Sequence, residues 1–129
     1  MNRYLLDTNA ALIALTEPDI LPRNMLKAVL AARNVLSVVS YWEVVLKSMK
    51  GNLKLDNPGT WWRDALDQLS ATPLLLRPEH IAELYNLPSI HKDPFDRVLI
   101  AQATAEGLEM LTTDTEIRRY ASPRFRVLP

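Results

Sequence analysis

A short apolar run that ends abruptly in polar residues is the feature that most constrains how this chain folds. Tyr4-Leu5-Leu6 is followed directly by Asp7 and then by Thr8-Asn9. The run predicts a buried strand, and Thr8-Asn9 predict the start of a helix that continues to Leu15. Asp7 is therefore expected at the carboxyl end of the first strand. In open α/β sheets, that edge is where ligands bind.

Apolar runs and helical patterns alternate along the rest of the chain. Strands are expected at 35–39, 74–76 and 108–112, and 125–128 is a candidate for a last strand. Helices are expected at 22–34, 40–51, 61–69, 78–84, 94–107 and 117–120, the 78–84 helix burying Ile81 and Leu84. The strands are nearly all apolar, as is typical of a parallel sheet covered on both faces. The sequence therefore predicts a three-layer α/β/α domain with a central parallel sheet of four or five strands.

Three further acids are expected near Asp7. Right-handed crossovers place the carboxyl ends of all parallel strands at one edge of the sheet. Asp114 follows the 108–112 strand, and Glu43 completes a Ser-x-x-Glu capping box with Ser40 at the start of the 40–51 helix. Asp96 falls in the first turn of the helix that begins after residue 93. We predict that these acids converge on Asp7.

A cluster of four carboxylates indicates a metal site. Close carboxylates repel one another and favour their protonated forms, and a divalent cation removes that conflict. The chain has no cysteine and only two histidines, which argues against zinc and favours Mg²⁺ or Mn²⁺. Such an ion activates water and stabilises charge on a phosphate. The chemistry expected is metal-assisted hydrolysis of a phosphodiester.

Each acid also has a purely structural interpretation. Acids near helix starts cap free amides and suit the helix dipole, as Asp93 and Asp114 would do. Glu43 lies four residues before Lys47 and can pair with it. Only the joint pattern favours a site. Arg97, beside the acid at position 96, is a candidate for contacting a phosphate.

The overall charge limits how the chain can bind nucleic acid. Fifteen basic and fifteen acidic residues cancel, so binding would have to use a local patch. The absence of cysteine suits a reducing cytoplasm. No apolar run has the length of about 18 residues that a membrane span requires, and neither a secretory leader nor a glycine-rich phosphate loop is recognisable.

Four motifs together resemble a known family. They are Leu5-Leu6-Asp7-Thr8-Asn9, Ser40-Tyr41-Trp42-Glu43, the run from Asp93-Pro94-Phe95-Asp96-Arg97 to Ala103, and Leu111-Thr112-Thr113-Asp114. In order and spacing they are similar to a PIN domain, and more narrowly to the VapC-type toxins of bacterial and archaeal toxin–antitoxin pairs. The resemblance covers nearly the whole chain and implies a single PIN domain over residues 1–129.

The resemblance implies an activity and a site. PIN domains are three-layer α/β nucleases whose acids bind Mg²⁺ or Mn²⁺ and cut RNA. The acidic set would be Asp7, Glu43, Asp96 and Asp114, with Asp7 and Asp96 as metal ligands. Thr112 or Thr113 would supply the hydroxyl that the family places near the last acid, and Asp93 would be an accessory residue.

The resemblance also implies partners. Toxins of this type form homodimers, act in the cytoplasm on RNA such as tRNA or rRNA, and are silenced by an antitoxin. The carboxyl-terminal segment of the antitoxin enters the active-site groove. No membrane partner is implied.

Three other functions remain open from the sequence. The chain is alternatively a PIN nuclease that processes RNA or cuts DNA, or a non-enzymatic module that only holds a partner in its groove. A phosphatase or receiver-like protein would need a lysine near the last strand, and no lysine follows Lys92. Retention of all four acids favours the nuclease over the binding module.

Overall fold

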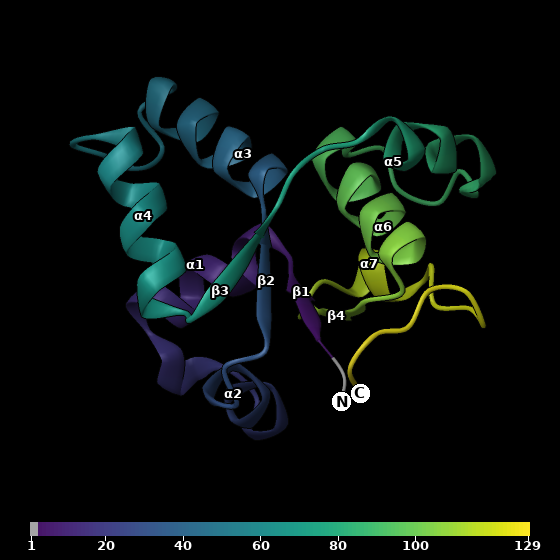
Figure 1. The fold of residues 1–129 in the computed structure, drawn as a ribbon, viewed down its shortest axis with the longest axis horizontal. Helices are drawn as coiled ribbons and strands as arrows, with labels where there is room; N and C mark the ends of the chain where they lie inside the picture. Colours follow the sequence, from purple (N-terminus) through teal and green to yellow (C-terminus); the bar gives the residue numbers. More distant parts are fainter. Residues whose placement is uncertain (1–2) are drawn as a thin grey trace.

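A four-stranded sheet forms the centre of the computed structural model, which describes residues 3–129 (Figure 1). Its strands are β1 (Tyr4–Leu6), β2 (Asn34–Ser37), β3 (Ala71–Leu74) and β4 (Glu109–Leu111). The strand order is β3-β2-β1-β4, and every pairing is parallel. All four strands therefore end at one edge of the sheet, as the sequence predicted.

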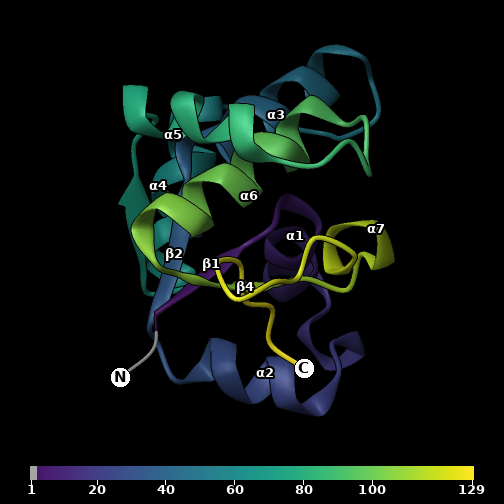
Figure 2. The same cartoon turned by 90° about the vertical axis from the view of Figure 1, so that its right-hand side faces the viewer.

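Helices cover both faces of the sheet, so the predicted three-layer architecture is confirmed (Figures 1 and 2). One face carries α1 (Thr8–Thr16), α2 (Arg23–Leu30) and α4 (Pro58–Gln68), and the other carries α5 (Pro78–Glu83), α6 (Pro94–Glu106) and α7 (Thr115–Arg118). Helix α3 (Val38–Met49) follows β2 at the carboxyl edge, and η1 (Pro18–Ile20) and η2 (Leu84–Asn86) are short 3₁₀ turns. Within residues 3–129, no helix has the length and apolar character needed to cross a membrane.

Successive strand residues enter two different cores. Leu5 packs in the core beneath α6, whereas its neighbour Leu6 packs in the core beneath α1, α2 and α4. The same alternation holds for Val35 and Leu36 in β2, and all four side chains are fully buried. Side chains alternate between the faces of a strand, so continuous apolar runs arise where both faces are covered.

The start of α3 differs from the prediction. The Ser37 hydroxyl accepts a hydrogen bond from the Val39 amide, so β2 ends at Ser37 and α3 begins at Val38. The predicted capping box at Ser40 is wrong, because Ser40 lies inside the helix and Glu43 in its second turn. Val38 and Val39 are β-branched and therefore favour a strand on sequence alone, but Ser37 before them caps a helix.

Two other elements were misplaced. The third strand is Ala71–Leu74, not 74–76, and Leu75 beyond it is 62% exposed. Strand β3 is an edge strand, where proline at position 73 is tolerated because it need not donate a hydrogen bond to a neighbouring strand. The segment 125–128 makes only an isolated bridge between Met110 and Val127.

The short helix α5 buries His80 and leaves the expected Ile81 exposed, whereas the expected Leu84 lies in η2 and is half-buried. Ile81 is 49% exposed, and His80 is fully buried. The His80 Nδ1 atom accepts from the Arg77 amide at 3.0 Å, and Nε2 lies 2.7 Å from a Glu106 carboxylate oxygen. These bonds anchor α5 to α6.

A buried glutamine extends this network to α3. The Gln102 amide nitrogen lies 3.3 Å from His80 Nδ1, and its oxygen accepts from the Ser37 hydroxyl at 2.5 Å. Ser37 caps α3, and Gln102 belongs to α6. The cap of α3 is thus held directly by α6.

Replacing Ile100 by alanine should destabilise the fold strongly. Ile100 lies on α6 with no exposed surface and packs in the core against the sheet. Truncation of a buried isoleucine to alanine costs about 2–5 kcal/mol, and to valine about 0.5–1.5 kcal/mol. Urea unfolding of both variants measures this difference. Equal losses for the two variants would show that the site relaxes around the cavity.

Candidate functional site

Asp7 lies at the junction of β1 and α1 and is held by bonds to three segments. It is 3% exposed and caps α1, accepting from the Ala10 amide at 2.7 Å. Its own amide donates to the Leu111 carbonyl at 3.1 Å. The Thr112 hydroxyl donates to its second carboxylate oxygen. Both oxygens are therefore fixed in place.

Thr112 connects Asp7 to Asp114. The Thr112 hydroxyl also accepts from the Asp114 amide at 2.9 Å, and Asp114 caps α7 by accepting from the Glu116 amide at 2.8 Å. The sequence left the hydroxyl open between Thr112 and Thr113. The structure buries Thr112 against Asp7 and leaves Thr113 exposed.

Glu43 reaches the site from the second turn of α3. A hydrogen bond of 2.9 Å from the Thr8 hydroxyl to that of Ser40 joins α1 to α3 beside it. One carboxylate oxygen of Glu43 lies 3.7 Å from the Lys47 ammonium, as the i,i+4 spacing predicted. The other, Oε1, is buried and has no hydrogen-bond partner among residues 3–129.

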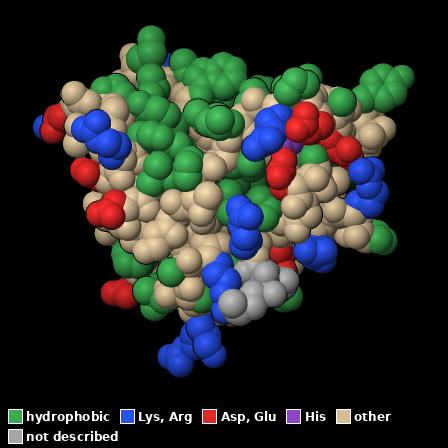
Figure 3. All heavy atoms as spheres, viewed as in Figure 1, with side chains coloured by type: hydrophobic (Ala, Val, Ile, Leu, Met, Phe, Trp, Pro, Cys, Tyr) green, Lys and Arg blue, Asp and Glu red, His purple; other side chains and the backbone are tan. Residues whose placement is uncertain are grey.

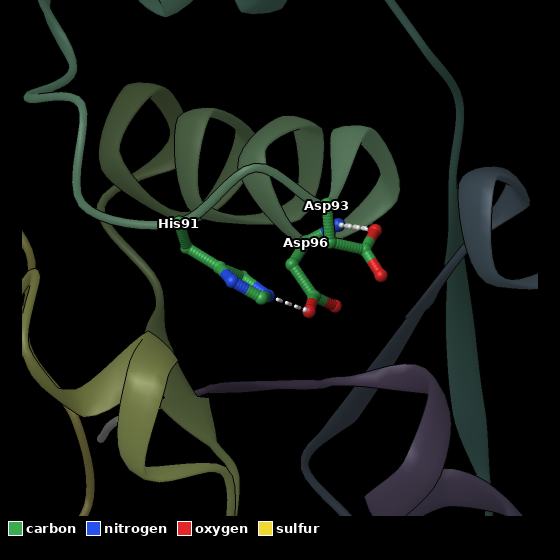
Figure 4. Close-up of side chains that lie close together, drawn as sticks. All are labelled: His91, Asp93 and Asp96. Carbon is green, nitrogen blue, oxygen red and sulfur yellow. Dashed lines mark hydrogen bonds and ion pairs between the residues drawn. The ribbon is translucent and has the colours of Figure 1, made fainter.

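Asp96 stands in the first turn of α6. Asp93 caps this helix as predicted, accepting from the amides of Phe95 at 2.9 Å and Asp96 at 3.2 Å. The Asp96 carboxylate points away from its helix, and its Oδ2 lies 2.9 Å from His91 Nε2 (Figure 4). Its side chain is 14% exposed.

The four acids act on one another electrostatically. The pKa of Asp7 rises from 3.8 to about 6, because burial, with smaller contributions from the charges of Asp114 and Glu43, outweighs the hydrogen bonds from Thr112 and Ala10. Burial also raises the pKa of Asp96 to about 6, helped by the charges of Asp93, Glu43 and Asp7. Glu43, Asp96 and Asp114 therefore all lie within electrostatic range of Asp7, at the carboxyl edge of the sheet.

This group of acids has the donor set that a hard divalent cation requires. Asp7 and Asp96 have raised pKa values, and Glu43 Oε1 is buried without a hydrogen-bond partner among residues 3–129. The site therefore has an excess of negative charge that a cation would neutralise. Carboxylate oxygens are the preferred ligands of Mg²⁺ and Mn²⁺. Among residues 3–129, the one group of three or more acidic or histidine side chains whose metal-binding atoms all lie within 4.8 Å of one another is His91, Asp93 and Asp96.

The sequence did not reveal two roles at this site. His91 was set aside because two histidines do not make a histidine-rich metal site, and its distance from Asp96 depends on the fold of a loop. The Arg97 guanidinium donates to the carbonyls of Pro88 at 3.0 Å and His91 at 3.4 Å, and to the Tyr120 hydroxyl at 3.2 Å. Arg97 thus holds this loop. A cavity of about 330 Å³ beside it is lined by Ser89, Ile90, His91, Lys92 and Arg97.

Comparison with known proteins decides the family. The family model described as PIN domain matches residues 4–123, which include all four acids. The chain belongs to the PIN domain family. No match was found among curated protein sequences.

Solved structures share the fold of this PIN domain. VapBC from Salmonella typhimurium, solved bound to DNA, is 17% identical with a TM-score of 0.72, over 99% of this chain and 98% of that one. A toxin–antitoxin complex from Klebsiella pneumoniae is 23% identical with a TM-score of 0.60, over 95% and 94% of the two chains. FitAcB from Neisseria gonorrhoeae is 20% identical with a TM-score of 0.60, over 98% and 96%.

Replacing Asp7 by asparagine should stabilise the metal-free PIN domain at neutral pH. The folded protein holds the Asp7 proton up to about pH 6 and the unfolded chain only to about 3.8, so stability is lost as pH rises between these values. A shift of about two units corresponds to on the order of 1–3 kcal/mol. Urea unfolding in chelator should show this gain for Asp7→Asn at pH 7.5 and none at pH 4.

Asp67→Asn is the matched control, because Asp67 is an exposed acid on α4. It should leave the unfolding free energy nearly unchanged at both pH values. A loss of stability in Asp7→Asn at pH 7.5 would contradict the assignment of Asp7 as a strained buried carboxylate.

Proposed function

We propose that this PIN domain is a Mg²⁺- or Mn²⁺-dependent endoribonuclease and the toxin of a VapC-type toxin–antitoxin pair. The observation that carries the proposal is the group of four acids, of which Asp7 is buried and the other three are partly buried. Two of their pKa values are raised, and one buried Glu43 oxygen lacks a hydrogen-bond partner among residues 3–129. If the acids only capped helices, the buried Oε1 atom of Glu43 would have no role. A site that binds a cation uses it.

The proposed mechanism gives each acid a distinct task. Asp7 and Asp96 would hold the ion, which would polarise the phosphate and lower the pKa of a water. The free oxygen of Glu43 accepts a hydrogen bond from the attacking water and orients it. Thr112 fixes the Asp7 carboxylate through its hydroxyl. Asp114 adds negative charge near Asp7 and holds the start of α7.

The proposed substrate is structured RNA, such as tRNA or rRNA. The net charge of zero disfavours tight binding to any nucleic acid by charge alone. Loops of folded RNA offer splayed bases and a defined shape, which suit a selective enzyme. Exposed Lys92 lines the cavity beside Asp96 and His91, where it supplies a contact for a phosphate.

The proposed partners are an antitoxin and a second copy of the chain, in the cytoplasm. The similarity to toxin–antitoxin complexes supports the first. Exposed apolar side chains along α3 and α5 support a protein interface, and Figure 3 shows apolar atoms gathered along the upper rim over α3. They include Trp42 and Met49 on α3 and Ile81 on α5, with Leu75 after β3 and Tyr85 in η2 nearby in the chain.

Purified protein should cut RNA only with a divalent ion. Incubated with a panel of tRNA and rRNA, it should give discrete fragments with Mg²⁺ or Mn²⁺ and none with a chelator. The cleavage rate of Asp7→Asn and of Asp96→Asn should fall by more than the roughly 10–100-fold that substitutions of the residues around metal ligands cost. Asp67→Asn should keep the wild-type rate. Metal-dependent cleavage that persists in both site variants would refute the assignment.

Expression in a bacterial host should separate the toxin from a housekeeping nuclease. The wild-type chain should arrest growth within a few generations, and the folded Asp96→Asn variant should not, because arrest depends on cleavage. Growth curves after induction measure the effect. Normal growth with soluble, active wild-type protein would favour a role in RNA processing.

A further inference from the structure

The loop before α6 is clamped by two side chains from different elements. The Tyr120 hydroxyl accepts from the His91 amide at 2.7 Å and donates to the His91 carbonyl at 3.2 Å. The Arg97 guanidinium donates to the same carbonyl and to that of Pro88. Both backbone polar groups of His91 are therefore bonded, and the position of its side chain is determined by α6 and by the residues after α7.

The clamp aims the His91 side chain into the acid cluster. Its Nε2 lies 2.9 Å from Asp96 Oδ2, and the two side chains are 23% and 14% exposed (Figure 4). A carboxylate only accepts hydrogen bonds, so His91 Nε2 is the donor in this contact. The bond occupies one Asp96 oxygen and limits how the carboxylate can rotate.

We propose that His91 is a positioning residue, which holds the Asp96 carboxylate in the orientation that binds the divalent ion. The inference rests on the proposed function only in taking Asp96 as a metal ligand. A loop that merely covered the end of α6 would not need a hydrogen-bond donor at this position, nor two clamps on the backbone of one residue. Hydrogen-bond partners of metal ligands set ligand orientation, and their loss typically costs about 10–100-fold in metal affinity.

The alternative role for His91 is direct metal ligation, and the choice of substitution separates the two roles. Glutamine places an amide donor near the position of Nε2 but lacks an imidazole nitrogen. His91→Gln should therefore preserve positioning and would abolish ligation. His91→Leu removes the donor while keeping an apolar side chain in the loop.

The test is Mn²⁺ binding to the full chain, measured by calorimetry without RNA. We expect His91→Leu to bind Mn²⁺ about 10–100-fold more weakly than wild type, and His91→Gln within about threefold. Asn86→Leu is the matched control, because Asn86 is exposed at the end of η2, directly before the same loop, and it should bind as wild type. Thermal unfolding in chelator confirms that each variant is folded.

Two results would overturn the inference. One is His91→Leu binding Mn²⁺ as tightly as wild type while Asp96→Asn does not. The other is His91→Gln losing as much affinity as His91→Leu, which would make the imidazole itself a ligand. RNA cleavage is measured separately, so His91-dependent Mn²⁺ binding without cleavage would reject the nuclease and keep the inference. Mn²⁺-dependent cleavage by wild type, together with an unchanged Mn²⁺ affinity in His91→Leu, would keep the nuclease and reject the inference.

Discussion

The burial of the Asp7 carboxylate at the end of β1 is the constraint on which the site depends. The Ala10 amide and the Thr112 hydroxyl stabilise its charge, but burial and the charges of Asp114 and Glu43 outweigh them and leave its pKa near 6. These contacts tie the first and last strands to α1 and α7. The same carboxylate thus joins the elements of the fold and concentrates negative charge.

That concentration of charge explains why so many other bonds surround the site. Asp93 caps α6, and the bond between Thr8 and Ser40 joins α1 to α3. The clamp on His91 fixes the loop before Asp96. Like charges held close together repel, so they stay in place only where the surrounding structure is rigid. Rigid placement in turn prepares the acids for a cation without a costly rearrangement.

The positions of Asp7 and Asp114 could be predicted from the sequence because topology alone determines where they lie. A parallel sheet with right-handed crossovers must bring Asp7 and Asp114 to one edge, whatever the details of packing. Side-chain partners are less predictable. Ser37 and Ser40 both precede helix-forming residues, and Ser37 caps α3 where Val39 is buried in the core and Gln102 accepts from the Ser37 hydroxyl. His91 carries no periodic or motif signal, since its contact with Asp96 depends on Tyr120, a residue 29 positions away.

The bond between Ser37 and Gln102 has a consequence for how this chain can diverge. Ser37 caps the helix that carries Glu43, and Gln102 belongs to the helix that carries Asp96. A change at either position leaves a buried polar group without its partner, so the two positions are expected to change together. Their coupling would record, in descendants of this sequence, the contact between the two helices that carry Glu43 and Asp96.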